Sequence, residues 1–319
     1  MKGYFFTMKY SIAETNTYDE LAGDQMTVKI LRCGAELFSM QINHPQYGVI
    51  GLLLNDGEEN PSHAWWNSHA PFLFPIVGGL VDKRSRCRDG REIMLDSHGF
   101  ARKTVFTVID KGQNRDCAWI EYGIDHTMIS NVVYPWHFEL GVRYEISGLG
   151  LKVSMKVTNT DETKIWYQCG WHPGFKTPFI YGKGKKSDVM LFMSKGKAIR
   201  YECDRDSFLT GNKKELELQG AFPFTENDLD YTYVLDLQEI KERSVGLFDP
   251  NSGITVTLSF DDFPHLGIWS NANGPFICLE PWQGCDDFAV QTLFEDKFGI
   301  AALDAGQHDK REINVSVSW

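Results

Sequence analysis

The chain has 319 residues, of which 42% are hydrophobic and 24% are charged, and its formal net charge is -11. This is the composition of a globular protein that can bury a sizeable core. The acidic balance argues against a nucleic-acid-binding surface, because it repels phosphate backbones. No stretch approaches the ~20 apolar residues needed to span a membrane, so no membrane association is expected.

The N-terminus and the cysteines bear on the compartment. Residues 1–20 open with a very short apolar patch that lacks the core and the cleavage site of a signal peptide. The seven cysteines are odd in number and scattered, which indicates neither a disulfide framework nor a zinc site. Small buried thiols in a reducing compartment fit best. We therefore expect a cytoplasmic protein in which residues 1–20 form a loosely ordered extension.

Alternation of apolar and polar residues is the dominant local pattern along the chain. It is clear at 151–158, at 254–260 and again at 313–319. A period of two residues is typical of half-buried antiparallel strands. The glycines of 148–150 predict a hairpin turn between the strand at 142–146 and the strand that follows it.

The wider organisation favours one domain. Helical signals are few, and Gly211 together with the leucine spacing argues against a helix at 206–219. The 29 glycines and 12 prolines are spread through the chain, which suits many turns better than a linker. A last strand that pairs into a sheet would tie the C-terminus to the body. We predict an all-β fold, a single large antiparallel β-sandwich over residues 21–319.

Four segments break the alternation and are therefore the places to look for chemistry, because loops on a rigid scaffold carry function. The first is apolar and contains two prolines, which excludes a central strand there. The others combine glycine, histidine, proline or tryptophan within a few residues. The four segments are 70–80, 97–102, 170–175 and 276–287.

Three titratable residues stand out in these segments. Glu280 ends an apolar run, and a buried glutamate has a raised pKa that suits a general acid or base near neutral pH. The alternative is a glutamate that simply meets solvent at a strand end. His98 and His172 lie in turns rich in glycine, proline and aromatic residues, where either a structural or a catalytic role is open. The three could also bind zinc or iron, but the local histidine spacing that supports such a site is missing, so we predict no metal.

Tryptophans also gather in irregular segments, at Trp65, Trp66, Trp171 and Trp282. An aromatic face next to carboxylates and amides can bind a sugar, because a pyranose has an apolar face and polar edges. Most such rings in proteins belong to the core instead. Trp171 and Trp282 are the stronger candidates for pocket residues, because they are next to His172 and close to Glu280 in the sequence.

Taken together and in this order, these motifs resemble the aldose 1-epimerase (galactose mutarotase) family, and particularly its LacX-like branch. The resemblance runs from about residue 24 to the end. It is carried by the segments 28–39, 73–78, 98–102, 170–175, 266–270 and 279–284. It implies a β-sandwich called a supersandwich, and an isomerase that interconverts the α and β anomers of an aldose without a cofactor.

The resemblance also implies roles for the titratable residues. Glu280 stands at the position of the general base, which takes the proton from the C1 hydroxyl of the sugar. His172 stands at the position of the general acid, which protonates the ring oxygen so that the ring opens. His98 stands at the position of a histidine that holds the substrate near C1. Rotation about the C1–C2 bond and reclosure then give the other anomer.

Sugar recognition is where the sequence departs from this pattern. Gly79 stands where an arginine is expected, and Arg84 and Arg102 are the candidates to supply a guanidinium instead. An aspartate that contacts sugar hydroxyls is expected at Asp228 or Asp230, together with walls formed by the two tryptophans singled out above. The expected partner is a small sugar, and the protein is a monomer or a homodimer. A hexose-phosphate mutarotase and a carbohydrate-binding protein without turnover remain alternatives.

Overall fold

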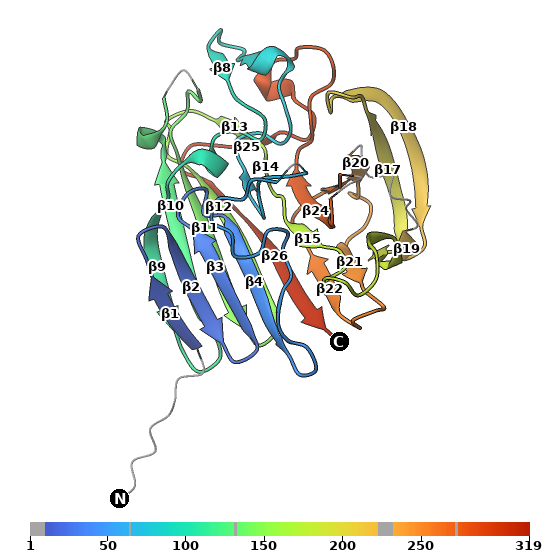
Figure 1. The fold of residues 1–319 in the computed structure, drawn as a ribbon. Helices are drawn as coiled ribbons and strands as arrows, with labels where there is room; N and C mark the ends of the chain where they lie inside the picture. Colours follow the sequence, from blue (N-terminus) through green and yellow to red (C-terminus); the bar gives the residue numbers. More distant parts are fainter. Residues whose placement is uncertain (1–9, 64, 131–132, 223–231, 272–273) are drawn as a thin grey trace, which may run out of the picture.

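The computed structural model describes residues 10–63, 65–130, 133–222, 232–271 and 274–319. Within these ranges the chain folds into three large antiparallel sheets and two small ones, with no α-helix (Figure 1). No helix of the described residues is long and apolar enough to cross a membrane. The few helical turns are 3₁₀ turns: η1 (Val81–Lys83), η2 (Ala101–Lys103), η3 (His126–Met128), η4 (Lys186–Asp188) and η5 (Phe294–Asp296).

The largest sheet has nine strands and forms one layer of the fold. Its strands alternate buried and partly exposed residues, as in β10 (Ala118–Asp125), because one face covers the core and the other meets solvent. In spatial order the strands are β19 (Ala221–Phe222), β16 (Met190–Met193), β21 (Ser244–Phe248), β22 (Thr255–Ser259), β26 (His308–Ser318), β12 (Gly150–Asn159), β11 (Phe138–Ser147), β10 (Ala118–Asp125) and β9 (Thr107–Gln113).

An eight-stranded sheet carries the segments that the sequence singles out. Its spatial order is β18 (Leu209–Leu218), β17 (Gly196–Cys203), β20 (Tyr233–Asp236), β23 (His265–Trp269), β24 (Phe276–Gln283), β14 (Cys169–Trp171) and β6 (Phe72–Leu73). The eighth strand, β15 (Gly174–Lys176), also pairs with β24. Strand β24 therefore lies inside the sheet, with β23 on one side and β14 and β15 on the other.

The remaining strands form a five-stranded meander and two small ribbons. The meander runs in chain order through β1 (Tyr10–Glu14), β2 (Tyr18–Gly23), β3 (Met26–Leu31), β4 (Leu37–His44) and β5 (Gly48–Gly51). The ribbons pair β7 (Arg84–Arg86) with β8 (Glu92–Met94) and β13 (Ile165–Tyr167) with β25 (Ala301–Leu303).

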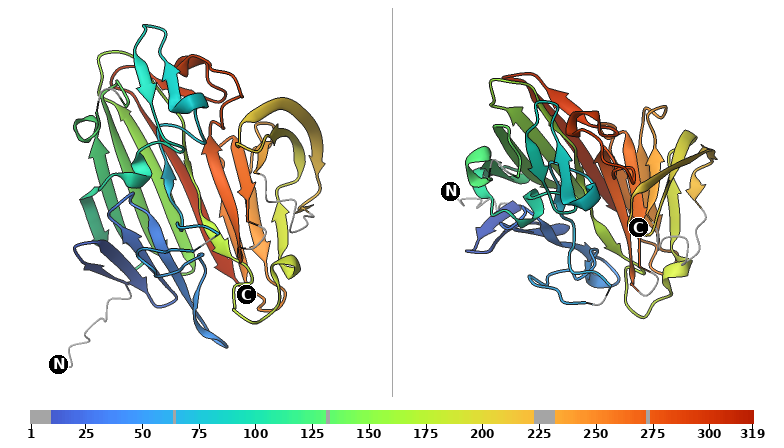
Figure 2. Two further views of the ribbon diagram at one scale, coloured as in Figure 1. Left: turned by 45° about the horizontal axis from the view of Figure 1, so that its top comes forward. Right: turned by 90° about the horizontal axis from the view of Figure 1, so that it is seen from above.

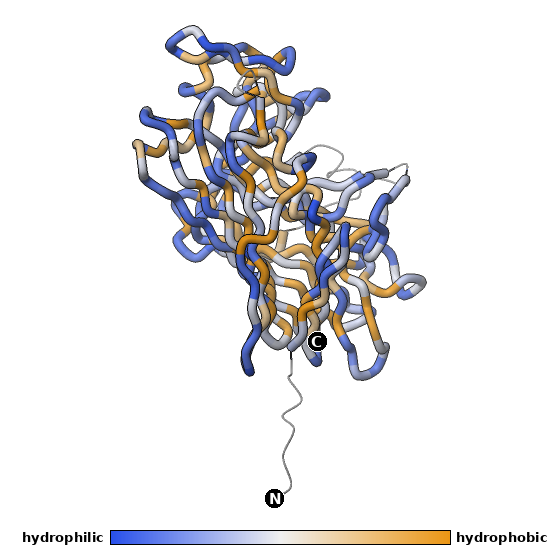
Figure 3. The backbone as a smooth tube through the Cα atoms, turned by 90° about the vertical axis from the view of Figure 1, so that its left-hand side faces the viewer, coloured by the Kyte–Doolittle hydropathy of each residue, from blue (hydrophilic) through white to orange (hydrophobic). Residues whose placement is uncertain are grey.

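The three large sheets enclose one hydrophobic core. Figures 1 and 2 show the five-stranded sheet, in blue, over one half of the nine-stranded sheet, with the eight-stranded sheet beside the other half. A single buried cluster contains Ile30 of the first sheet, Val153 of the second and Leu279 of the third. Figure 3 shows the hydrophobic segments gathered in the interior and hydrophilic ones at the outer loops. The fold is thus a large antiparallel β-sandwich, as predicted.

Several local predictions are confirmed by the pairing. The hairpin forms between β11 and β12, with Ser147 opposite Gly150. The last strand, β26, lies between β22 and β12 and so ties the C-terminus into the sheet. Of the proline-rich segment at 70–80, only two residues become a strand, at the sheet edge. All seven cysteines are free.

The N-terminal boundary differs from the prediction. Residues 1–9 lie outside the described residues, but β1 and the start of β2 fall within the expected extension of residues 1–20 and pair with each other. Tyr10 and Leu21 are buried, because their side chains pack into the common core. The loosely ordered extension therefore does not reach residue 20. The prediction of a single domain stays a prediction.

Candidate functional site

Strand β24 sends its side chains alternately to the core and to the opposite face of the sheet. Ile277 and Leu279 belong to the common core. Cys278, Glu280 and Trp282 consequently lie together on the other face, although they are buried too, with at most 1% of each exposed. The apolar residues before Glu280 therefore point alternately to both faces of the sheet. The Glu280 carboxylate lies on the face that points away from the common core.

Glycines on the neighbouring strands make room on this face. Gly267 of β23 pairs with Glu280, and Gly170 of β14 pairs with Trp282. A Cβ atom at Gly267 or Gly170 would lie 2.4 or 2.6 Å from the Trp282 indole, so that ring packs directly onto the backbone of both strands. A glycine at both positions therefore lets a large ring lie flat beside the carboxylate.

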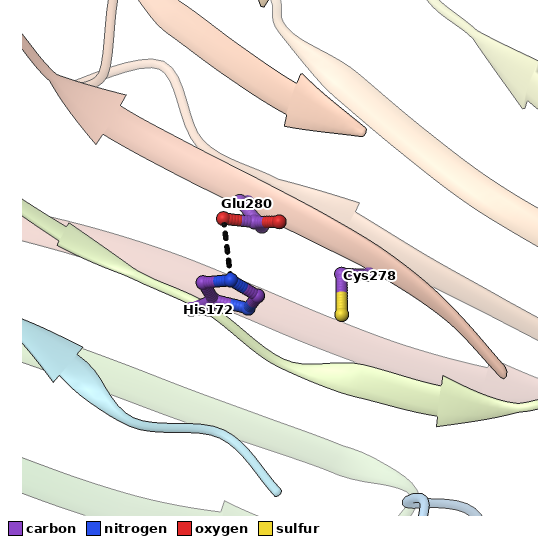
Figure 4. Close-up of side chains that lie close together, drawn as sticks. All are labelled: His172, Cys278 and Glu280. Atoms are coloured by element: carbon purple, nitrogen blue, oxygen red, sulfur yellow. Dashed lines mark ion pairs between the residues drawn. The ribbon is translucent and has the colours of Figure 1, made fainter. Parts of the chain in front are cut away.

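His172 reaches the same place from the short turn between β14 and β15. Its backbone N–H donates to the carbonyl of Pro71 at 3.0 Å, which fixes the turn against the proline-rich segment. Its Nε2 lies 3.1 Å from Oε2 of Glu280 (Figure 4). Trp66 stacks on the imidazole with ring centroids 5.0 Å apart, and Trp269 of β23 meets it edge-on at 6.0 Å. The carboxylate and the imidazole thus form a close pair within an aromatic enclosure.

Burial sets the protonation of this pair. Apart from the contact with His172, neither carboxylate oxygen of Glu280 has a partner among the described residues, and both are buried. Burial, and secondarily the charge of Asp286, raises the pKa of Glu280 well above its usual value. Burial, assisted by His98 and Arg102, lowers the pKa of His172 well below its usual value. The pair therefore holds one proton between its two members over a wide pH range.

His98 is the third titratable group, and its tautomer follows from its hydrogen bond. Its backbone has φ +64°, and its Nδ1 accepts from the N–H of Gly78 at 3.0 Å. Burial and the charge of Arg102 lower the pKa of His98 to about 3. The ring is therefore neutral at ordinary pH, and with Nδ1 as an acceptor its hydrogen is on Nε2. The ring lies edge-on to His172, 5.5 Å between centroids, so one hydrogen-bond donor stands next to the pair.

Arg102 provides a positive charge near these groups. Its side chain is partly exposed, and among the described residues it makes no ion pair and no hydrogen bond. Burial lowers the pKa of Arg102, while the carboxylate of Glu36 opposes that shift. The guanidinium lines a small surface hollow whose other lining residues are His63, Trp65, Trp66, Asn67 and Ser68. It is thus available to a ligand.

Glu36 has a structural part in this arrangement that the sequence did not reveal. Its Oε1 accepts hydrogen bonds from the Ser68 hydroxyl at 2.6 Å and from the backbone N–H groups of His69 and Ala70 at 2.8 and 3.1 Å. These bonds fix the segment between Trp66 and β6 onto the body of the fold. Hydrogen bonding from His69 and Ser68 outweighs burial, so the pKa of Glu36 is lowered.

At Gly79, where an arginine was expected, the backbone contacts a buried carboxyl group. The N–H of Gly79 donates to Oδ1 of Asp286 at 3.2 Å. That aspartate is only 5% exposed, and burial raises its pKa to about 7. A Cβ atom at Gly78 would lie 1.6 Å from the same oxygen, whereas at Gly79 it would meet only the Phe208 ring, at 3.8 Å. Backbone, not a guanidinium, therefore faces this carboxyl group.

Two of the predicted sugar-contacting residues, Trp171 and Trp282, are buried. Trp171 is completely buried in the common core, and its indole N–H donates to the carbonyl of Ala70 at 2.9 Å. It therefore offers no ring face to a ligand in this structure. Trp282 lies on the same face as Glu280 but is 1% exposed, packed in a second cluster with Val77 and Tyr201. Asp228 and Asp230 lie outside the described residues.

Three neighbours of the pair were not among the predicted site residues: Trp66, Trp269 and Cys278. The sequence spacing could have indicated two of them, because residues two apart on a strand point to the same face of the sheet. Cys278 is two residues from Glu280. Trp269 is two residues from Gly267, which pairs with Glu280. Trp66 comes from a loop, where no periodicity indicates which way a ring points.

The fold and the site together define a galactose mutarotase-like sandwich with a buried carboxylate–imidazole pair. The chain belongs to the aldose 1-epimerase family, whose model matches residues 20–316. The chromosomally encoded protein LacX of Lactococcus lactis subsp. lactis is 33% identical over 313 residues, covering 93% of this chain and 98% of that protein.

Solved structures show the same architecture. A galactose mutarotase-like protein from Lactobacillus casei ATCC 334 is 25% identical with a TM-score of 0.79, covering 97% of this chain and 100% of that one. A galactose mutarotase related enzyme from Lactobacillus acidophilus is 24% identical with a TM-score of 0.80, covering 97% of both chains. This last likeness bears on the fold alone.

Proposed function

We propose that this protein is an aldose 1-epimerase in which Glu280 is the general base and His172 the general acid. The observation that carries the proposal is the 3.1 Å separation of Oε2 of Glu280 from Nε2 of His172. Membership of the aldose 1-epimerase family supports an isomerase of this kind.

The closeness of the pair suits the reaction. Ring opening needs a proton to leave the C1 hydroxyl and another to arrive at the ring oxygen. Both oxygens are bonded to the same carbon, so the base and the acid that act on them must also lie close together. A sugar that brings C1 to the open side of the pair can reach both groups at once, and each positioned group contributes ~100- to 10,000-fold to the rate.

The single proton held by the Glu280–His172 pair suits a reaction that runs in both directions. In the free protein, burial favours a proton on Glu280 and a neutral His172. A sugar hydroxyl that donates to Glu280 stabilises the carboxylate, so the proton passes across the short contact to His172. The base and the acid are then both in the required form. Ring opening moves one proton onto Glu280 and one off His172, and ring closure reverses both transfers.

Two further residues are proposed to hold the substrate. The Nε2–H of His98 donates to the oxygen on C1, because its tautomer leaves that hydrogen facing outward from the Gly78 contact. Arg102 donates to sugar hydroxyls from the rim, because its guanidinium has no partner among the described residues. A tryptophan face, that of Trp66, lies between this rim and His172.

A free aldose suits the surroundings better than a sugar phosphate. The segment 84–91 carries four arginines that could bind a phosphate, and three of them are already engaged in ion pairs. Arg86 lies 3.5 Å from Glu92, Arg88 lies 2.6 Å from Asp296, and Arg91 lies 2.8 Å from Asp89. We therefore propose a neutral sugar as the substrate.

Anomer exchange tests the proposal. Freshly dissolved α-glucose and α-galactose, and the 6-phosphates of both sugars, are followed by polarimetry with and without protein. The proposal predicts acceleration for a free sugar and a smaller effect for its phosphate. Acceleration confined to the phosphates would establish a hexose-phosphate mutarotase instead. Ligand-induced thermal stabilisation with no acceleration would point to a carbohydrate-binding protein.

A further inference from the structure

Cys278 adds a thiol to the carboxylate–imidazole pair. The ligand atoms of His172, Cys278 and Glu280 all lie within 4.8 Å of one another, and all three residues are buried. Among the described residues this is the one group of three histidine, cysteine or acidic side chains close enough to hold a metal ion. Figure 4 shows the thiol and the imidazole on the same side of β24.

The backbone favours a shared ligand position. Cys278 and Glu280 are two residues apart on a strand, so their side chains point the same way. His172 faces them from the turn next to β15, which pairs with β24 through Cys278 itself. A tetrahedral zinc ion has bonds of about 2.0–2.3 Å and so holds its ligand atoms roughly 3.5 Å apart. The observed separations, all within 4.8 Å, approach that spacing.

The polar atoms here lack other partners. Apart from the contact between Glu280 and His172 themselves, both oxygens of Glu280 and the Nδ1 of His172 are buried with no hydrogen bond among the described residues. Glu280 is only 1% exposed, so water supplies little compensation. Unsatisfied buried carboxylate oxygens are costly, and a cation that coordinates one of them removes part of that cost. A cation would therefore supply a partner that these buried atoms lack.

We propose that His172, Cys278 and Glu280 form a binding site for a thiophilic divalent cation such as Zn²⁺, and that the bound ion blocks anomer exchange. Thiolate, imidazole and carboxylate are the three ligand types that zinc takes in proteins. Three protein ligands leave a fourth position open, which water or a small anion fills. The binding claim is independent of the proposed function, whereas the inhibition rests on it.

Binding displaces protons, which gives the proposal a pH dependence. The Cys278 thiol loses its proton to become a thiolate, and the Glu280–His172 pair loses the single proton that it holds. Protons therefore leave as Zn²⁺ binds, and no electron is transferred. Affinity rises with pH, as expected for a metal that competes with protons for its ligands. The same displacement removes the proton on which acid catalysis by His172 depends.

A direct titration tests the site without any sugar. The protein is titrated with Zn²⁺ in competition with a chromogenic chelator, and Co²⁺ is used in parallel for its thiolate charge-transfer absorption. Wild type should bind one Zn²⁺ and show the Co²⁺–thiolate band. Cys278→Ser should lose the band and bind Zn²⁺ at least ~100-fold more weakly, which is the upper end of the loss caused by removing a mere supporting residue.

The matched control is Cys33→Ser, because Cys33 is exposed and is not part of the group formed by His172, Cys278 and Glu280. It should bind Zn²⁺ as the wild type does. Circular dichroism and thermal unfolding verify that each variant is folded, and His172→Asn provides a second ligand deletion. Zn²⁺ binding by Cys278→Ser equal to that of wild type would overturn the proposal, as would the absence of one-to-one binding by wild type.

Activity assays separate this proposal from the proposed function. In a chelator, wild type and Cys278→Ser should both accelerate anomer exchange. Added Zn²⁺ should inhibit wild type and Cys33→Ser but leave Cys278→Ser active. Equal inhibition of all three proteins would overturn the inhibitory claim. An inactive wild type that nevertheless binds Zn²⁺ through Cys278 would refute the proposed function and leave the metal site standing.

Discussion

Oε2 of Glu280 lies 3.1 Å from Nε2 of His172, although Glu280 is on strand β24, His172 is in the turn between β14 and β15, and the two are 108 positions apart in the chain. The carboxylate is held by β24 in the middle of a sheet, and the imidazole by a short turn against that strand. Because burial favours the neutral form of each group, the pair keeps one proton. This shared proton is the basis of the first prediction.

The pH dependence of anomer exchange should show a broad plateau. Activity requires one proton on the pair, and it is lost at low pH when a second proton binds, and at high pH when none is left. Since the pKa of His172 is lowered, the acidic limb lies below pH 6.5. His98, whose pKa is about 3, adds no limb near neutrality. Polarimetry corrected for spontaneous mutarotation measures the profile, and a half-maximal rate at or above pH 6.5 on the acidic side would contradict it.

Arg102→Gln should weaken substrate binding more than it affects the fold. A hydrogen bond to a charged group contributes ~1.5–3 kcal/mol, so KM should rise about 10- to 100-fold. Arg102 has no partner to lose among the described residues, so the free energy of unfolding should hardly change. Arg84→Gln is the control, since that arginine is exposed. Equal KM values for the two variants would remove Arg102 from the proposed site.

Gly174→Ala should disturb the aromatic enclosure. The new Cβ would lie 2.6 Å from Cζ3 of Trp66 and 3.3 Å from Sγ of Cys278. Overpacking of this kind costs ~1–3 kcal/mol, and displacement of the Trp66 ring from His172 should lower the exchange rate. Urea unfolding and tryptophan fluorescence measure both effects.

The control for that substitution is Gly79→Ala, where the added Cβ meets only the Phe208 ring at 3.8 Å. Its stability should stay within about 1 kcal/mol of wild type, because alanine mainly restricts the unfolded chain. If the two alanine variants were equally stable, the Trp66 packing would not be as close as the structure places it.

Asp286→Asn should stabilise the protein at neutral pH and not at acidic pH. Burial raises the pKa of Asp286 from 3.8 to about 7, so between these values the folded protein binds more protons than the unfolded chain. The free energy of unfolding of wild type therefore falls as pH rises through this window. The shift corresponds to at most ~4 kcal/mol above pH 7.

The measurement is urea unfolding of both proteins at pH 4 and pH 8. The two should be nearly equal at pH 4, where the Asp286 carboxyl is largely protonated, and the variant should be more stable at pH 8. Asparagine keeps an oxygen that can accept the Gly79 N–H, so the hydrogen bond is preserved. A difference that is the same at both pH values would show that the carboxyl group is not held protonated by burial.

The fold could be predicted because its signal is local. Alternation at 151–158 and 313–319 specifies strands with one buried face, and the glycines at 148–150 specify a hairpin; β12 and β26 then pair with each other. The N-terminal boundary could not be found this way. Strand β1 is bound by its pairing with β2 and by burial of Tyr10, and neither is visible in the local pattern.

The site was only partly predictable. The sequence motifs identified Glu280 and His172 as candidates. The local sequence pattern does not predict, however, that the turn after β14 packs against the middle of β24. The choice of tryptophans shows the difficulty most clearly. Gly170 pairs with Trp282 and faces the site, so its neighbour Trp171 must point to the core. Its adjacency to a site histidine in the sequence was therefore misleading, and the ring that stacks on His172 comes from Trp66.

The most direct test of the central claim is the anomer exchange rate of Glu280→Gln, measured by NMR exchange on glucose and galactose alongside wild type. Glutamine keeps the size of the side chain but cannot take a proton, so the rate should fall ~100- to 10,000-fold. Thermal unfolding verifies that the variant is folded. A folded variant that exchanges anomers at the wild-type rate would contradict the role of Glu280 as the general base.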